Sequence, residues 1–210
     1  MEVKKVAAKS VVWSMYGNAF NQTINFAIFI FLARALSVEE FGLLAICLLM
    51  IEFSSVFQSF GLHQQLIRQK KWNNSLASTA FWLALIVSGG ISILILLFGV
   101  PVAYFYHSSL AANCFLLLSL FPLLQGCRQV HASKLQRDFK FKLLSIVESV
   151  AVFFGGIITV SLAFMDFGVW SLIIGRLVQQ LVELSIIFSS SDFSPSFELQ
   201  KSYVVKIKNY

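Results

Sequence analysis

The sequence predicts an all-α integral membrane protein, a bundle of six transmembrane helices. Hydrophobic residues make up 58% of the 210 residues, the mean hydropathy is +0.79, and only 12% of the residues are charged. Soluble domains carry about 25% charged residues, so this composition excludes an ordinary soluble domain. The apolar residues also gather into stretches long enough to cross the roughly 30 Å hydrocarbon core of a bilayer.

Six apolar stretches are separated by short polar connections. Pro101 and Pro122 lie late in the third and fourth stretches, where neighbouring helices can satisfy the carbonyl that a proline leaves free. The residues 191–210 are expected to form a polar linker and a basic tail in the cytoplasm. The transmembrane unit covers 1–190, with spans at about 11–33, 41–62, 79–104, 109–127, 143–165 and 168–190.

The basic residues predict the orientation of the chain. Of the 16 Lys and Arg residues, all but Arg34 and Arg176 lie in the N-terminus, the second and fourth connections, or the tail. Short loops rich in Lys and Arg stay on the cytoplasmic side, so we expect six crossings with both termini cytoplasmic. The net charge of +6 is thereby explained by topology, and no nucleic-acid partner is expected.

The first span contains a stripe of amide side chains. They are spaced at i, i+3, i+4 and i+7, which places them on one face of a helix. Unpartnered amides in hydrocarbon are costly, so this face is expected to meet other helices or a watery cavity. The stripe consists of Asn18, Asn21, Gln22 and Asn25.

Two ionisable residues lie deep within spans, Glu52 in the second and Arg176 in the sixth. The sixth span carries a second polar stripe of the same spacing, formed by Arg176, Gln179, Gln180 and Glu183. One interpretation is a hydrophilic cavity that accepts an anionic group, with Arg176 as its charge partner. The other is structural, with a buried Glu52–Arg176 ion pair and amides that bond between helices.

A basic cluster with interleaved phenylalanines lies in the fourth connection. Lys134, Arg137, Lys140 and Lys142 are candidates for binding lipid headgroup phosphates, although such a cluster also serves simply to set the topology. Small residues in the spans are expected to permit close helix packing, at Gly89-Gly90, Gly155-Gly156, and Ser171 with Gly175.

No motif predicts a cofactor, a metal site or an enzyme. The three cysteines lie in or beside apolar stretches, and neither they nor the three histidines have metal-ligand spacing. Phosphate-binding loops and nucleophile elbows are also lacking in the sequence.

Several connecting stretches resemble the polysaccharide flippases, the lipopolysaccharide (O-antigen, exopolysaccharide) exporters of the multidrug/oligosaccharidyl-lipid/polysaccharide superfamily. LARALSVEEFGLLA (32–45) is similar to the family's joint between the first two helices, although Val38 stands where proline is common. The resemblance extends to FGLHQQLIRQ (60–69), where Ser59 replaces a common acidic residue, to HASKLQRDFKFKLLSIVESV (131–150) and to GVWSLIIGRLVQQL (168–181).

This resemblance implies transport of an undecaprenyl-diphosphate-linked oligosaccharide across the bacterial inner (cytoplasmic) membrane by alternating access. Family members have two six-helix lobes, and this chain resembles the N-terminal lobe alone. A second lobe is therefore expected, from a homodimer or a separate chain, with membrane lipid and polysaccharide polymerase machinery as further partners. Arg176 would attract the diphosphate, and Glu52 would bind a coupling proton or cation.

Two other readings compete with a flippase lobe. A truncated, inactive membrane remnant or scaffold would tolerate alanine at Arg176 and Glu52. A membrane-embedded polysaccharide polymerase or acyltransferase would need catalytic groups on a sizeable outer loop, and the outer connections here are short and nearly uncharged.

Overall fold

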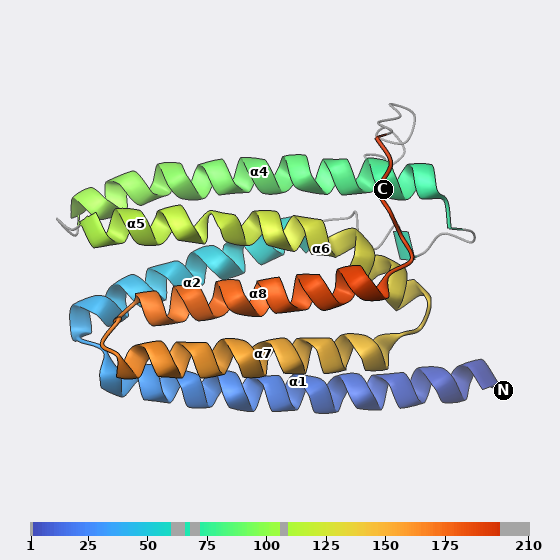
Figure 1. Cartoon of the computed structure of the whole chain (residues 1–210), viewed down its shortest axis with the longest axis horizontal. Coiled ribbons are helices and arrows are strands. Elements are labelled where there is room, and N and C mark those ends of the chain that lie inside the picture. Colours follow the sequence, from blue (N-terminus) through green and yellow to red (C-terminus); the bar gives the residue numbers. More distant parts are fainter. Residues whose placement is uncertain (1, 60–65, 68–71, 106–108, 198–210) are drawn as a thin grey trace.

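The protein is a bundle of long antiparallel helices (Figure 1). The structure, a computed structural model, describes residues 2–59, 66–67, 72–105 and 109–197. No strand occurs in these ranges, which confirms the all-α membrane fold class. The helices are α1 (Glu2–Ala35), α2 (Val38–Ser59), α4 (Asn74–Phe105), α5 (Ser109–Leu118), α6 (Leu120–Arg137), α7 (Phe141–Phe164) and α8 (Trp170–Ser190).

Helices α5 and α6 run end to end as one rod, with a break at Ser119. Pro122 lies three residues after this break and has no N–H to donate to the carbonyl of Leu118. Beside this break, the carbonyl of Pro122 itself accepts a hydrogen bond of 3.3 Å from Gln58 Nε2 of α2. At Pro101, by contrast, α4 continues through the proline.

Five of the described helical segments are long and apolar enough to cross a membrane by length and composition: Val38–Gln58, Asn74–Phe105, Ala111–Arg137, Phe141–Phe164 and Trp170–Ser190. Helix α1 is not among them, although it packs along α7 over much of its length. The amide stripe lowers its hydropathy, so the sixth crossing stays a prediction that rests on helix length and on packing.

The helix of the fourth expected span continues beyond residue 127, where we expected that span to end. Helix α6 continues to Arg137, and Val130 and Leu135 are buried in the part that we expected to be a connection. The connection to α7 is therefore confined to residues 138–140. The charged residues of 128–137 lie on a helix that packs against α4 and α8.

One end of the bundle is formed by the starts of α1 and α4, the α6–α7 connection and the end of α8. We call it the basic end, because the connection and the adjoining turns hold Lys134, Arg137, Lys140 and Lys142. Other basic residues are expected at this end. Those at 68, 70, 71, 201, 206 and 208 lie outside the described residues, and the side chains of those at 4, 5 and 9 are not described. The motif at 60–69 and the tail after 197 also fall largely outside the description.

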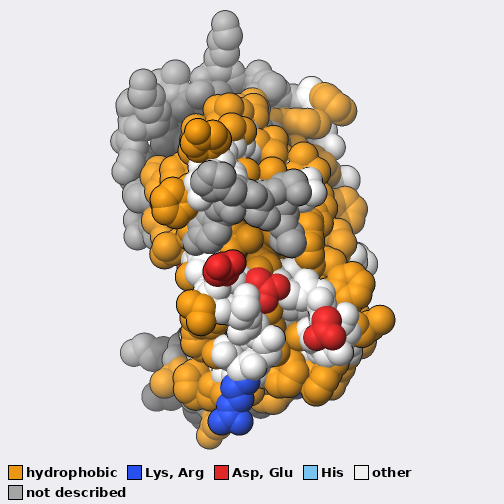
Figure 2. Space-filling view, turned by 90° about the vertical axis from the view of Figure 1, so that its left-hand side faces the viewer, with side chains coloured by type: hydrophobic (Ala, Val, Ile, Leu, Met, Phe, Trp, Pro, Cys, Tyr) orange, Lys and Arg blue, Asp and Glu red, His pale blue; other side chains and the backbone are white. Residues whose placement is uncertain are grey.

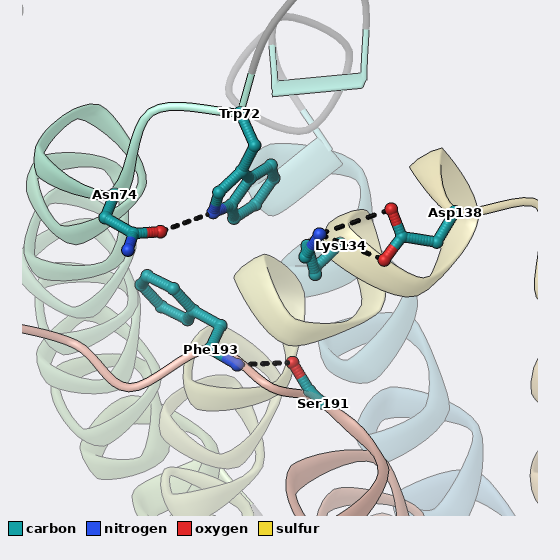
Figure 3. A network of polar contacts seen from close by, with 6 residues as sticks. All are labelled: Trp72, Asn74, Lys134, Asp138, Ser191 and Phe193. Carbon is teal, nitrogen blue, oxygen red and sulfur yellow. Dashed lines mark hydrogen bonds and ion pairs between the residues drawn. The ribbon is translucent and has the colours of Figure 1, made fainter.

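The linker after α8 packs onto the basic end. Phe193 is buried against Trp72, and its N–H bonds Ser191 Oγ at 3.4 Å (Figure 3). The N–H of Ser196 donates to Ser78 Oγ at 3.0 Å, and Trp82 Nε1 donates to the carbonyl of Ser196 at 3.1 Å. The residues 191–197 are thus held against α4 and α6.

The joint between α1 and α2 is a capping box. Ser37 Oγ accepts from the N–H of Glu40 at 3.3 Å, and Glu40 Oε2 accepts from the N–H of Ser37 at 3.0 Å. The two bonds satisfy backbone donors that the first turn of α2 leaves free. The motif that resembles the exporter joint therefore has a physical role, since it starts α2 directly after α1 ends.

Replacing Ser37 with alanine removes the cap of α2, and we expect the free energy of unfolding to fall by about 1 kcal/mol. SDS titration of the purified protein, followed by circular dichroism, measures this change. Ser189→Ala is the control, because Ser189 Oγ bonds only the carbonyl of Ile186 in the last turn of α8. An equal effect of the two substitutions would contradict the role of the capping box.

Helices α7 and α8 approach closely at glycines. A Cβ on Gly155 would lie 2.7 Å from the carbonyl oxygen of Gly175, and a Cβ on Gly175 would meet Thr159 Oγ1. The expected small-residue packing is therefore present at Gly155 and Gly175. It is absent at Gly89 and Gly90, where an added Cβ has no described atom within 4 Å.

Candidate functional site

A cavity of about 340 Å³ lies between α1, α2, α7 and α8. One part of its wall is apolar and includes Phe26, Phe29, Leu44, Leu48 and Leu172. The polar part is contributed by all four helices and consists of Gln22, Asn25, Glu52, Thr159, Arg176 and Gln179. The cavity thus joins apolar surface to a guanidinium and several amides.

The guanidinium of Arg176 forms a hydrogen bond to a side chain of its own helix. Its Nη1 donates to Gln179 Oε1 at 3.1 Å, as the i, i+3 spacing allows. Glu52 lines the same cavity, but the described residues show no ion pair between Glu52 and Arg176. The guanidinium therefore keeps donors that a negatively charged ligand could use.

The structure separates the predicted amide stripe of α1. Gln22 and Asn25 line the cavity, whereas Asn18 is exposed and belongs to neither described cavity. Asn21 is buried, and its amide nitrogen and oxygen have no partner among the described residues. A stripe of this spacing covers a wide arc of the helix surface, so residues at its two edges can contact different neighbouring helices.

A second cavity, of about 410 Å³, lies nearer the basic end between α2, α6, α7 and α8. Gln180, which we expected beside Arg176, lines this second cavity, and Gln179 lines both. Glu183 lies here as well and forms an ion pair with Arg128.

Sequence reasoning missed the α6 side of the second cavity. Gln125, Arg128 and Gln129 are spaced at i, i+3 and i+4, with Gln136 two turns further on the same face. This spacing is the same signal that marked α1 and α8. We overlooked it because Arg128 was assigned to a connection rather than to a helix.

The basic cluster is organised around tryptophans. Lys134 Nζ pairs with Asp138 at 3.0 Å and lies 5.0 Å from the centre of the Trp72 ring (Figure 3). The Arg137 guanidinium lies 5.7 Å from the centre of the same ring. Lys142 lies over Trp13, and Lys140 is exposed. Tryptophan and basic residues gather in this way at membrane interfaces. Binding of headgroups by the cluster stays a prediction.

The outer surface of the bundle is apolar. Large side chains such as Phe53, Ile93, Leu97 and Phe153 are exposed along its sides. Figure 2 shows the end opposite the basic end, where hydrophobic side chains predominate and charged ones are few. An apolar exterior around internal polar cavities defines a multi-pass membrane protein.

Comparison with known proteins identifies the family. Residues 31–210 match the family described as polysaccharide biosynthesis protein, and the chain belongs to this family. It is 28% identical over 206 residues to the succinoglycan biosynthesis transport protein ExoT of Rhizobium meliloti (strain 1021), covering 98% of this chain and 42% of the relative. It is also 21% identical over 160 residues to an uncharacterized membrane protein in the cps region of Klebsiella pneumoniae, covering 76% of this chain and 33% of the relative.

The chain thus spans less than half of the length of each of these two relatives. No solved structure matches the chain significantly. The expected relationship to polysaccharide biosynthesis and export proteins is confirmed by the family match and by the Rhizobium relative.

Proposed function

We propose that this chain forms one lobe of a transporter that moves an undecaprenyl-diphosphate-linked oligosaccharide across the bacterial inner membrane. Family membership and the name of the Rhizobium relative support a role in polysaccharide transport. The matched part is 42% of that relative, which supports the view that a second lobe completes the transporter. Alternating access then requires the two lobes to rock against each other.

The first cavity carries this proposal, because it combines the two chemistries of a lipid diphosphate. Arg176 supplies a guanidinium, which binds phosphate oxygens with several donors at once. The apolar wall beside it suits the first isoprene units of a polyprenyl chain. A soluble sugar phosphate would gain nothing from that wall, which favours a lipid-linked substrate.

Glu52 is the proposed coupling residue of the same cavity. It lines the cavity with Arg176, and the described residues show no salt bridge within 4.0 Å between the two, so its carboxylate could bind a proton or a cation while still feeling the charge of Arg176. A cation bound at Glu52 would change the electrostatic potential at Arg176, and a diphosphate bound at Arg176 would change it at Glu52. Binding of each would therefore alter the affinity for the other. This is the type of coupling that alternating access needs.

The proposed orientation places the basic end and both termini in the cytoplasm. Lys140 and Lys142 are exposed there, beside Trp13 and Phe139, and would contact anionic headgroups of the inner leaflet. The substrate is made on that side, so the second cavity lies at its entry side. Polysaccharide polymerase machinery would receive the product on the opposite side.

Complementation tests the proposal. We would express this chain in a bacterium lacking its surface-polysaccharide exporter, alone and together with the C-terminal half of that exporter, and measure surface polymer and the lipid-linked intermediate. Arg176→Ala is expected to reduce polymer by at least about tenfold and to raise the intermediate, because charge-assisted hydrogen bonds to phosphate are lost.

Arg34→Ala is the matched control, since Arg34 is an exposed arginine at the opposite end of the bundle. It should leave the polymer level unchanged. If the stably inserted chain restores no polymer, either alone or with the C-terminal half of the exporter, the transporter proposal is wrong. An inactive scaffold is then the better account. Equal activity of the wild type and Arg176→Ala would reject the role of the first cavity.

A further inference from the structure

The second cavity has features of a ligand site that the proposed transport function does not use. With a volume of about 410 Å³ it falls in the range of small-molecule sites, which begins near 300 Å³. Its polar lining is dominated by glutamines from three helices, including Gln58 of α2, Gln125 of α6 and Gln180 of α8. At an ordinary helix interface of a membrane protein, such amides would form hydrogen bonds to a neighbouring helix.

Three of these glutamines have buried amide oxygens without a donor. Gln58 Oε1, Gln125 Oε1 and Gln180 Oε1 have no hydrogen-bond partner among the described residues. Gln58 and Gln180 are only 5% and 7% exposed. A buried acceptor without a partner is destabilising, because it has given up its hydrogen bonds to water and gained none in the protein. Three such acceptors around one cavity indicate that a molecule with several hydrogen-bond donors completes it.

Further hydrogen bonds hold part of this lining in place. Gln58 Nε2 donates to the carbonyl of Pro122 at 3.3 Å, and Gln129 Nε2 donates to the carbonyl of Gln58 at 2.7 Å. The first bond uses the amide nitrogen of Gln58 and leaves its oxygen as the free group. These contacts cross between α2 and α6, so they fix the acceptor relative to both helices.

The charge of the cavity disfavours an anion. Arg128 is already paired with Glu183, and Glu148 adds a second carboxylate to the lining. A phosphate would therefore meet an excess of negative charge and several unpartnered oxygens, with Arg128 Nε as an unpartnered donor among the described atoms. A single metal cation would find oxygen ligands, but it would leave most of the 410 Å³ unfilled and would lie near Arg128. A neutral ligand with many hydroxyl groups fits both the charge and the size.

The two cavities adjoin at Gln179, which lines both. On α8, Arg176 and Gln180 are four residues apart, which corresponds to about 6 Å along the helix. A sugar attached directly to a diphosphate lies at a comparable distance from the phosphates. Because α8 runs toward the basic end, the sugar would point to that end.

We propose that the second cavity is a carbohydrate subsite, in which Gln58, Gln125 and Gln180 accept hydrogen bonds from hydroxyl groups of the sugar next to the diphosphate. This inference rests on the proposed function, because it takes the ligand of the first cavity to be a lipid diphosphate. The ion pair of Arg128 and Glu183 forms one edge of the subsite. The subsite binds the hydroxyl groups of the sugar, whereas Arg176 binds the charged diphosphate.

Binding of two lipids to the full chain in lipid nanodiscs tests the subsite. The probes are undecaprenyl diphosphate and undecaprenyl diphosphate glucose, with dissociation constants measured by microscale thermophoresis. We expect the wild type to bind the glucose-bearing lipid about 3- to 10-fold more tightly. Gln125→Leu with Gln180→Leu should abolish this preference and leave the affinity for undecaprenyl diphosphate unchanged.

Leucine at these positions also removes the unpartnered acceptors, so the variants are expected to fold. Asn21→Leu is the matched control, since Asn21 is a buried, unpartnered amide that lines neither cavity. It should retain the preference for the glucose-bearing lipid.

The outcomes separate the subsite from the proposed function. Equal affinity of the wild type for the two lipids, or a preference that survives in the double variant, would overturn the subsite alone. Binding of neither lipid, or binding unaffected by Arg176→Ala, would overturn the proposed function.

Discussion

Replacing Arg128 with methionine is expected to lower the free energy of unfolding by about 3 to 5 kcal/mol, the usual effect of removing one partner of a buried ion pair. The side chain of Glu183 is only 8% exposed, and Arg128 is its ion-pair partner. Without the guanidinium, the carboxylate of Glu183 shares the second cavity with that of Glu148.

SDS unfolding of the purified variants measures this effect. The double variant Arg128→Met with Glu183→Leu should recover most of the loss, because no unpaired charge remains buried. Lys134→Met is the control, since it breaks the more exposed pair with Asp138 and should cost less than about 1 kcal/mol. If Arg128→Met unfolds at the same SDS fraction as the wild type, the ion pair does not stabilise the bundle.

Gly175→Ala is expected to destabilise the bundle by about 1 to 3 kcal/mol, although alanine favours helices. The added Cβ would lie 2.8 Å from the carbonyl oxygen of Gly155 and would collide with Thr159 Oγ1. Both atoms belong to α7, the helix that packs most extensively against α8. The two helices would have to separate, and this would also disturb Arg176 and Gln179 in the next turn of α8.

Gly89→Ala is the matched control for this prediction. The same substitution in α4 meets no described atom within 4 Å, so only the helix propensity of alanine acts. It should leave the stability unchanged or raise it by up to about 1 kcal/mol. Thermal unfolding of both variants in the same detergent gives the comparison. A stabilising effect at Gly175 as well would show that α7 and α8 do not need their close approach.

Much of the architecture could be predicted from the sequence, because hydrophobic length and helical periodicity are local properties. Each apolar stretch lies largely within a helix, except that the fourth is divided between α5 and α6. The S-x-x-E pattern at Ser37 forms the cap that the structure shows. The spacing of Arg176, Gln179 and Gln180 placed them together on one face of α8. That four helices enclose Gln22, Glu52 and Arg176 in one cavity was a hypothesis that helical spacing alone could not decide.

Helical spacing tells which side chains share a face, but not which helix that face meets. Only the tertiary structure therefore separated Asn18 and Asn21 from the first cavity, and Gln180 from Arg176. It also showed that Gly175 meets α7 while Gly89 meets open space.

The sequence by itself determined that this is a multi-pass α-helical membrane protein with polar faces on its first and last helices. A segment that crosses lipid must be a long apolar helix, so the few polar side chains in such a helix stand out in the sequence. The tertiary structure alone decided the place of Arg128. Charged residues that follow an apolar stretch are typical of a connection between helices. Arg128 instead lies on a helix inside the bundle, because it forms an ion pair with Glu183, 55 residues further along the chain. A charged side chain can be buried only beside a side chain of opposite charge, and which side chain that is depends on how the helices pack.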